Sequence, residues 1–195
     1  MTNISDYSLF EKDTQLPGEI DIRDLITLIG MDGDLRRDRI CNWWEENRQD
    51  KKIYLFPFKT KSPIVGCFIE NGRIAINSNQ IGGMPPEMVL FVLLHESRHS
   101  DQSKSGEYHK EYFQTVLDED LESFRRIYKE AESDANVYAL NTMNSMGFNI
   151  FTRVSGPRLR RNEETADQIY SMMRSDILMY KPFNFPDLII KQISG

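Results

Sequence analysis

The stretch Met88-Val-Leu-Phe-Val-Leu-Leu-His95-Glu96-Ser-Arg-His99 decides how the rest of the chain must be arranged. Seven apolar residues precede His95 without a charge, which is typical of a helix that is buried on most of its surface. Residues four apart lie one above the other on a helix, so His95 and His99 share a face and Glu96 lies beside them. Unpaired polar groups in a core cost several kcal/mol. The stretch therefore predicts a core helix that carries a polar site.

The spacing H-E-x-x-H is the signature of zinc-dependent peptidases. Two histidines at i and i+4 can bind one tetrahedral Zn²⁺, and the intervening glutamate can act as a general base. Zinc lowers the pKa of a bound water to about 7, so Glu96 would accept its proton. The whole chain has three histidines, so the motif does not result from a histidine-rich composition. We expect His95 and His99 to be zinc ligands and Glu96 to be the catalytic base.

Composition narrows the class of protein. The chain has 195 residues, of which 39% are hydrophobic and 11% aromatic, enough to bury one sizeable core. We expect a single domain over residues 1–195. The net charge of −6 argues against general binding to nucleic acids or membrane surfaces, because these attract basic proteins.

Targeting signals and disulfides are not expected. The segment Met1–Tyr7 lacks a basic run followed by an apolar one, and no apolar run reaches membrane-spanning length. We therefore expect a cytoplasmic protein. Cys41 and Cys67 are too few for a disulfide framework or a zinc ribbon, and we expect reduced packing residues.

The order of patterns along the chain is helical, then β, then helical, which predicts an α+β fold. Helical spacing over about 19–49, interrupted at Gly30–Gly33, indicates an N-terminal helical hairpin. Short β-rich runs over about 53–77, with Glu70-Asn71-Gly72 as a hairpin turn, predict a small antiparallel sheet. The catalytic helices are expected over about 85–146, with a break at 103–106 and a second long helix from Tyr108 to Met146.

A C-terminal helical extension is expected over about 147–195. It contains a helical pattern over about Glu163–Tyr180, preceded by a basic stretch, Arg153–Arg161. Four arginines in an acidic chain favour a solvated loop with local ion pairs over a binding site for an acidic partner.

A catalytic zinc site needs a third protein ligand. His109 is the remaining histidine, but the pattern H-E-x-x-H-x-x-G-x-x-H would need a glycine at Gln102 and a histidine at Ser105. A cysteine ligand, as in peptide deformylases, would have to be Cys41 or Cys67, and the surroundings of Cys67 do not match that class. A glutamate from the next helix is the better candidate.

Glu132 is that glutamate. With about 3.6 residues per turn, it shares a face with the small residues Ala135 and Ala139, whereas Glu130 and Asp134 are expected on the opposite side. The two alanines would let this helix approach the H-E-x-x-H helix closely.

Two further expectations concern the surroundings of Glu132. Asn136, one turn later, is placed to accept a hydrogen bond from the ring N–H of His95 or His99 and so to orient the ligand. The alternative reading of Glu132 is a buried salt bridge with Arg98 or Arg126.

His95-Glu96-x-x-His99 together with Glu132-x-x-Ala135-Asn136-x-Tyr138-Ala139 resembles the gluzincins, especially their small cytosolic ImmA/IrrE-like members. The resemblance covers roughly residues 73–146. It implies a minimal zincin-like fold in which His95, His99 and Glu132 bind Zn²⁺ and Glu96 is the base. The chain departs from the family at Arg98, where many members have glycine, and the N-terminal hairpin and the last fifty residues carry no resemblance.

The sequence thus predicts a zinc metallopeptidase that hydrolyses peptide bonds in a protein or peptide substrate, with narrow specificity inside the cell. Tyr108, His109 and Tyr112 follow the H-E-x-x-H helix and are candidates to stabilise the oxyanion. The strand Arg73–Asn77, or a neighbour, would bind an extended peptide along its edge. The alternative is a zinc-binding interaction protein of the same fold with little or no hydrolytic activity.

Overall fold

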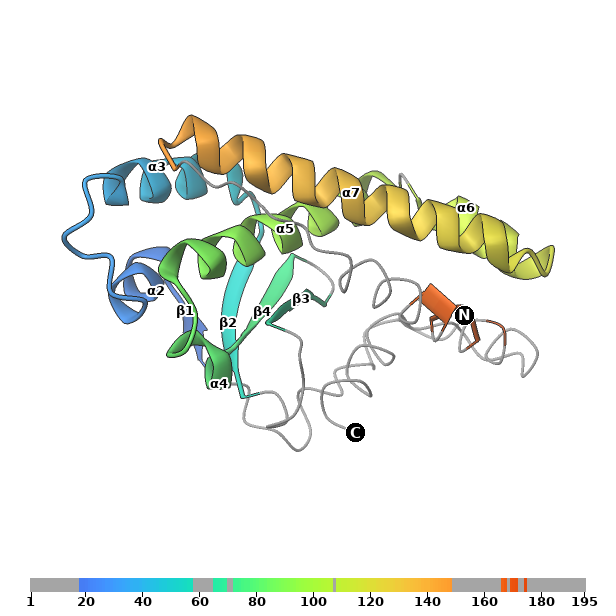
Figure 1. Cartoon of the computed structure of the whole chain (residues 1–195), viewed down its shortest axis with the longest axis horizontal. Helices are drawn as coiled ribbons and strands as arrows, with labels where there is room; N and C mark the ends of the chain where they lie inside the picture. Colours follow the sequence, from blue (N-terminus) through green and yellow to red (C-terminus); the bar gives the residue numbers. More distant parts are fainter. Residues whose placement is uncertain are drawn as a thin grey trace.

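The computed structural model describes residues 18–57, 65–69, 72–106 and 108–148, together with 166, 167, 169–171 and 174. Figure 1 shows a small sheet, helix α5 across it and the long helix α7 across α5 on the other side. The predicted α+β class is confirmed. None of the described helices combines the length and the apolar composition that crossing a bilayer requires.

After residue 21 the elements follow the predicted order of helices, strands and helices, but the predicted N-terminal helical hairpin over about 19–49 is wrong at its start, because residues 19 and 20 form a short strand. The elements are β1 (Glu19–Ile20), α2 (Ile22–Leu28), α3 (Arg37–Asn47), β2 (Lys52–Phe56), β3 (Gly66–Phe68), β4 (Arg73–Asn77), α4 (Ser78–Ile81), α5 (Pro86–Ser105), α6 (His109–Leu117) and α7 (Leu121–Ser145). Residues 166, 167, 169–171 and 174 are helical and fall within the helix predicted over 163–180. The rest of that helix and the basic stretch 153–161 lie outside the described residues.

The sheet is mixed, so the prediction of an antiparallel sheet is wrong for its central pair. The strand order is β1-β2-β4-β3. The pairs β1–β2 and β3–β4 are antiparallel, but β2 and β4 are parallel, with Ile53 opposite Ile74. A parallel pair needs a crossover rather than a tight turn, and the chain between β2 and β4 makes it by way of β3. Alternation of apolar and polar residues predicts where strands lie but not which strands pair with each other.

The predicted hairpin turn joins β3 to β4. The N–H of Ile69 donates to the carbonyl of Arg73 at 2.8 Å. Gly72 has φ +76°, and a Cβ there would lie 2.8 Å from the carbonyl oxygen of Asp50. Glycine is therefore required by both conformation and space. Glu70 and Asn71, the first two residues of the turn, lie outside the described residues.

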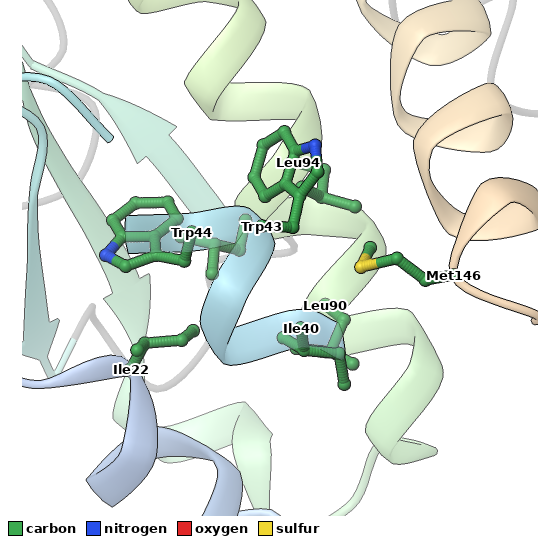
Figure 2. Close-up of a pocket in the computed structure, with 8 residues that line it drawn as sticks. Ile22, Ile40, Trp43, Trp44, Leu90, Leu94 and Met146 are labelled. Carbon is green, nitrogen blue, oxygen red and sulfur yellow. The ribbon is translucent and has the colours of Figure 1, made fainter. Parts of the chain in front are cut away.

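The N-terminal helices pack on α5 and so hold it in the core. Figure 2 shows side chains from α2, α3 and α5 meeting around a small gap. The volume of this gap is about 10 Å³, room for no more than one water molecule. Its lining is wholly apolar: Ile22, Ile40, Trp43, Trp44, Leu90, Leu93, Leu94 and Met146. Both cysteines are free and buried, as expected of packing residues. This junction is a packed interior and not a ligand site.

The helix predicted over Tyr108–Met146 is two helices, and the prediction of one continuous helix is wrong. Asp118 ends α6, Glu119 has φ +57°, and the Asp120 side chain accepts the N–H of Ser123 at 2.9 Å at the start of α7. An aspartate at this position is a strong helix N-cap. The break lets α6 fold against α7, where Val116, Phe124, Ala166, Ile169 and Tyr170 form a second, smaller core.

Replacement of Leu90 by alanine tests whether α5 is the central core helix. Leu90 is 1% exposed, so Leu90→Ala is expected to lower the free energy of unfolding by about 2–5 kcal/mol. Leu35 is 97% exposed, so Leu35→Ala should change it by less than about 0.5 kcal/mol. Urea denaturation of both variants measures the difference, and equal losses would contradict the packing described.

Candidate metal centre

Three side chains predicted as ligands converge between α5 and α7. The Nε2 atoms of His95 and His99 are 3.0 Å apart. The Glu132 carboxylate lies 3.5 Å from Nε2 of His95 and 3.3 Å from Nε2 of His99. The three side chains are 13–19% exposed, so the cluster is largely shielded but keeps some contact with solvent.

The spacing of these atoms fits a tetrahedral metal. Zinc bonds of about 2.05 Å at tetrahedral angles separate the donor atoms by about 3.3 Å. The two nitrogens are 3.0 Å apart, and each lies near a different oxygen of Glu132, His95 at 3.5 Å from Oε2 and His99 at 3.3 Å from Oε1, so all three separations are close to that value. Among the described residues, this is the group of three or more histidine, cysteine or carboxylate side chains that comes close enough to hold a metal ion. Two imidazoles and one carboxylate are also one of the donor sets that catalytic zinc sites use.

Small residues on α7 bring Glu132 to the histidines. Ala131, Ala135 and Ala139 are all buried, and they repeat every fourth position along the face that packs on α5. We call this packed boundary the α5–α7 seam. The predicted roles of Ala135 and Ala139 and the inward face of Glu132 are confirmed. The Tyr128 hydroxyl also forms a hydrogen bond with Glu132.

The salt-bridge reading of Glu132 is wrong, because both arginines have other partners. Nε of Arg98 lies 2.6 Å from Oδ2 of Asp134, and Nη1 of Arg126 lies 3.1 Å from Oε1 of Glu130. Asp134 was expected on the far side of α7, and this is also wrong. It stands three residues after Ala131 and therefore on the flank of the α5–α7 seam, within reach of side chains from α5.

Glu96 is held by the edge of the sheet. The backbone N–H of Phe68 in β3 donates to Oε2 of Glu96 at 2.7 Å. In the β3–β4 register Cys67 is opposite Ala75 and Ile69 bonds to Arg73, so the N–H of Phe68 points away from β4. Phe68 thus fixes one carboxylate oxygen of Glu96 beside the two histidines.

A glycine makes this contact geometrically feasible. A Cβ at Gly66 would lie 2.5 Å from Cγ1 of Val92, so a larger residue would push β3 away from α5. The neighbouring Cys67 thiol is held neutral, because burial and the nearby Glu96 charge raise its pKa well above the ordinary value.

The electrostatics of the cluster favour one positive charge. Burial alone would lower the pKa of His99, but the hydrogen bond to Glu132 and its charge raise the pKa to about 9. Burial likewise opposes ionisation of Glu132, yet its bonds to His95 and His99 hold its pKa well below the ordinary value. In the metal-free protein a proton supplies the positive charge that a metal ion would otherwise supply.

Three predicted oxyanion donors differ in how they are placed. The Tyr112 ring lies 5.1 Å from Phe124 and 6.4 Å from Tyr108, within the second core. Burial, followed by the Glu132 charge, raises the pKa of Tyr112, so its hydroxyl stays a neutral donor. Tyr108 precedes α6, and the side chain of His109 lies outside the described residues.

The hydrogen bond predicted for Asn136 is made by another residue. Nδ1 of His99 lies 2.7 Å from Oε1 of Gln102, and Nδ1 of His95 has no hydrogen-bond partner within the part of the chain that the structure describes. Asn136 therefore does not orient either ring through such a bond. Sequence analysis missed Gln102, although its position three residues after His99 on one helix face was a usable signal.

A hollow larger than the gap in Figure 2 lies away from the metal centre, and none of the three predicted ligands lines it. It has a volume of about 310 Å³ and is lined by residues of β1, α2, α3 and β2 with the loops between them. Charged side chains in its wall pair with each other or with neighbours, as Lys52 does with Glu19 at 2.8 Å and Lys51 with Asp101 at 2.6 Å. Both lysines of its wall therefore already have acidic partners.

Comparisons with protein-family models, with curated proteins and with solved structures find no match to the chain. The functional argument therefore depends on the geometry and chemistry of the site itself.

Metal content tests the ligand set directly. The purified protein is expected to hold about one zinc ion per chain, and Glu132→Ala should lose it because two imidazoles alone leave the site one donor short. Glu130→Ala is the matched control, since Glu130 is exposed and pairs with Arg126, and it should keep the metal. Elemental analysis after dialysis measures all three, and equal zinc in both variants would contradict the assignment.

The stability of the metal-free protein should depend on pH through His99. Its pKa of about 9 exceeds the ordinary 6.5, so its contribution to the free energy of unfolding is complete below about pH 6.5 and is lost as the pH rises through about 9. Glu132→Gln removes the cause of the shift and should flatten this decline. Urea denaturation in a chelator across this range measures the slopes, with Glu130→Gln expected to follow wild type. A decline of equal steepness in Glu132→Gln would contradict the pairing.

Proposed function

We propose that the protein is a zinc-dependent peptidase of the gluzincin type. The observation that carries the proposal is the convergence of His95, His99 and Glu132 at tetrahedral spacing with Glu96 beside them. Structural zinc sites are closed by four protein ligands, whereas catalytic sites keep the fourth position for water or substrate. Within the described residues, no fourth histidine, cysteine or carboxylate joins the group, which favours the catalytic type.

The residues divide the work of amide hydrolysis between them. A zinc ion in this site would polarise the scissile carbonyl and acidify a water molecule. Glu96 accepts the proton of the attacking water and later delivers it to the leaving amine. The Phe68 N–H keeps the Glu96 carboxylate in place, and the Tyr128 hydroxyl does the same for Glu132. These two contacts preorganise the base and the third ligand.

The edge of β3 supports an extended peptide as the substrate. The strand predicted for this role, Arg73–Asn77, is β4 and lies between β2 and β3, so its neighbour β3 is the strand at the edge. Backbone groups of Gly66 and Phe68 face away from β4 in the observed register. The N–H of Phe68 is bonded to Glu96, so a peptide would pair with the other outward-facing backbone groups of these two residues. A peptide that adds to this edge as a further strand would lie next to Glu96. We expect the substrate to be a specific protein inside the cell, as for the family that the motifs resemble.

Replacement of Glu96 by glutamine separates catalysis from metal binding. Glu96→Gln is expected to keep the zinc ion and to lose cleavage by about 10²–10⁴-fold, because an amide cannot accept the proton. Zinc-loaded wild type and variant would be incubated with a peptide library derived from a digested proteome, and cleavage would be followed by mass spectrometry. Glu87→Gln is the control, since Glu87 lies in the first turn of the same helix and faces Arg36 at 3.7 Å.

Two results would contradict the proposal. Equal cleavage by wild type and Glu96→Gln would show that Glu96 is not the base. Zinc-loaded wild type that cleaves no peptide in the library would favour the alternative, a zinc-binding interaction protein of the same fold.

A further inference from the structure

Gln102 joins a metal ligand on α5 to two acceptors on α7. Its side chain is buried in the α5–α7 seam. The amide nitrogen Nε2 donates to the carbonyl oxygen of Ala131 at 3.0 Å and to Oδ2 of Asp134 at 2.8 Å. The amide oxygen Oε1 lies 2.7 Å from Nδ1 of His99.

The two acceptors on α7 fix the orientation of the amide. An amide nitrogen has two hydrogens, and each has one acceptor here. The reversed orientation would bring Oε1 against the Ala131 carbonyl and the Asp134 carboxylate, which both lack a hydrogen to donate. Asp134 is itself held by Nε of Arg98 at 2.6 Å, so the acceptor on this side is secured. Gln102 can therefore present only its oxygen to His99.

This orientation determines the tautomer of His99. Because Oε1 only accepts hydrogen bonds, Nδ1 of His99 must carry the hydrogen. In the neutral ring the lone pair is then on Nε2, the atom that faces His95 and Glu132. The opposite tautomer would place a hydrogen where the metal bond has to form.

We propose that Gln102 is a positioning residue for His99, which it holds as the Nδ1–H tautomer with Nε2 directed at the metal position, and that Asp134 holds Gln102. The inference rests on the proposed function only through the metal ion. Metal binding then depends on the α5–α7 seam, because Gln102 orients His99 on α5. Gln102 is in turn oriented by two acceptors on α7. His95 has no corresponding partner for Nδ1 among the described residues, so this control acts on one of the two histidines.

Gln102→Met tests the proposal, because methionine keeps the length and the apolar stem but removes the acceptor. Zinc affinity, measured by competition with a chromophoric chelator, is expected to fall about 10–100-fold. Gln114→Met is the matched control, since Gln114 also donates to an aspartate, Asp118 at 2.8 Å, but is exposed on α6. It should bind zinc as wild type does. Unchanged affinity in Gln102→Met would overturn the proposal and leave Gln102 as a packing residue.

A second readout needs neither catalysis nor the variant. With three histidines in the chain, ¹⁵N-histidine labelling gives a simple side-chain spectrum, and wild type should show a slowly exchanging Nδ1–H signal for His99 with and without zinc. A rapidly exchanging Nδ1–H, or coordination of zinc through Nδ1, would overturn the proposal even if Gln102→Met fails to fold. Zinc-loaded protein that cleaves no peptide would instead overturn the proposed function and leave this inference intact.

Discussion

The whole arrangement depends on bringing three electron-pair donors together in the α5–α7 seam. Two imidazole nitrogens and a carboxylate at 3.0–3.5 Å from one another cannot all stay uncompensated in a shielded place, because unpaired polar and charged groups are costly there. A cation resolves the conflict, whether it is a proton on His99 or a metal ion. The packing of α7 on α5 sets the distances between the three groups, and the site therefore needs a cation whenever the two helices are packed.

This constraint explains why the sequence predicts the site better than the fold around it. His95 and His99 are four residues apart, and Glu132 belongs to a face marked by small apolar residues, so helical periodicity alone places all three. The periodicity also identifies α5 as the core helix. It fails at Glu119, where a positive φ interrupts the predicted helix, because the capping signal of Asp120 is local and competes with a strong helical pattern.

Predictions that depend on partners across space failed for a different reason. A run of residues that favour strands does not indicate which other strand it pairs with, so the sequence does not predict the parallel β2–β4 pair. Asp134 and Gln102 are similar cases. Each is polar and lies near the boundary of a helix face, and only the packed structure decides that they meet each other and His99. Asn136 was predicted because it stands one turn after Glu132, but Gln102, on the helix of His99, makes the bond.

The mixed topology has a consequence for Glu96 that an antiparallel meander would not have. In the order β2-β3-β4, strand β3 would be interior and both of its edges would bond to neighbouring strands. The observed order places β3 at the edge, which leaves the Phe68 N–H for Glu96. Gly66 then allows β3 to approach α5 closely enough for the bond to form. Strand order, a glycine and one backbone donor therefore act together to hold Glu96 in place, and the proposed peptide substrate would share this strand edge with Glu96.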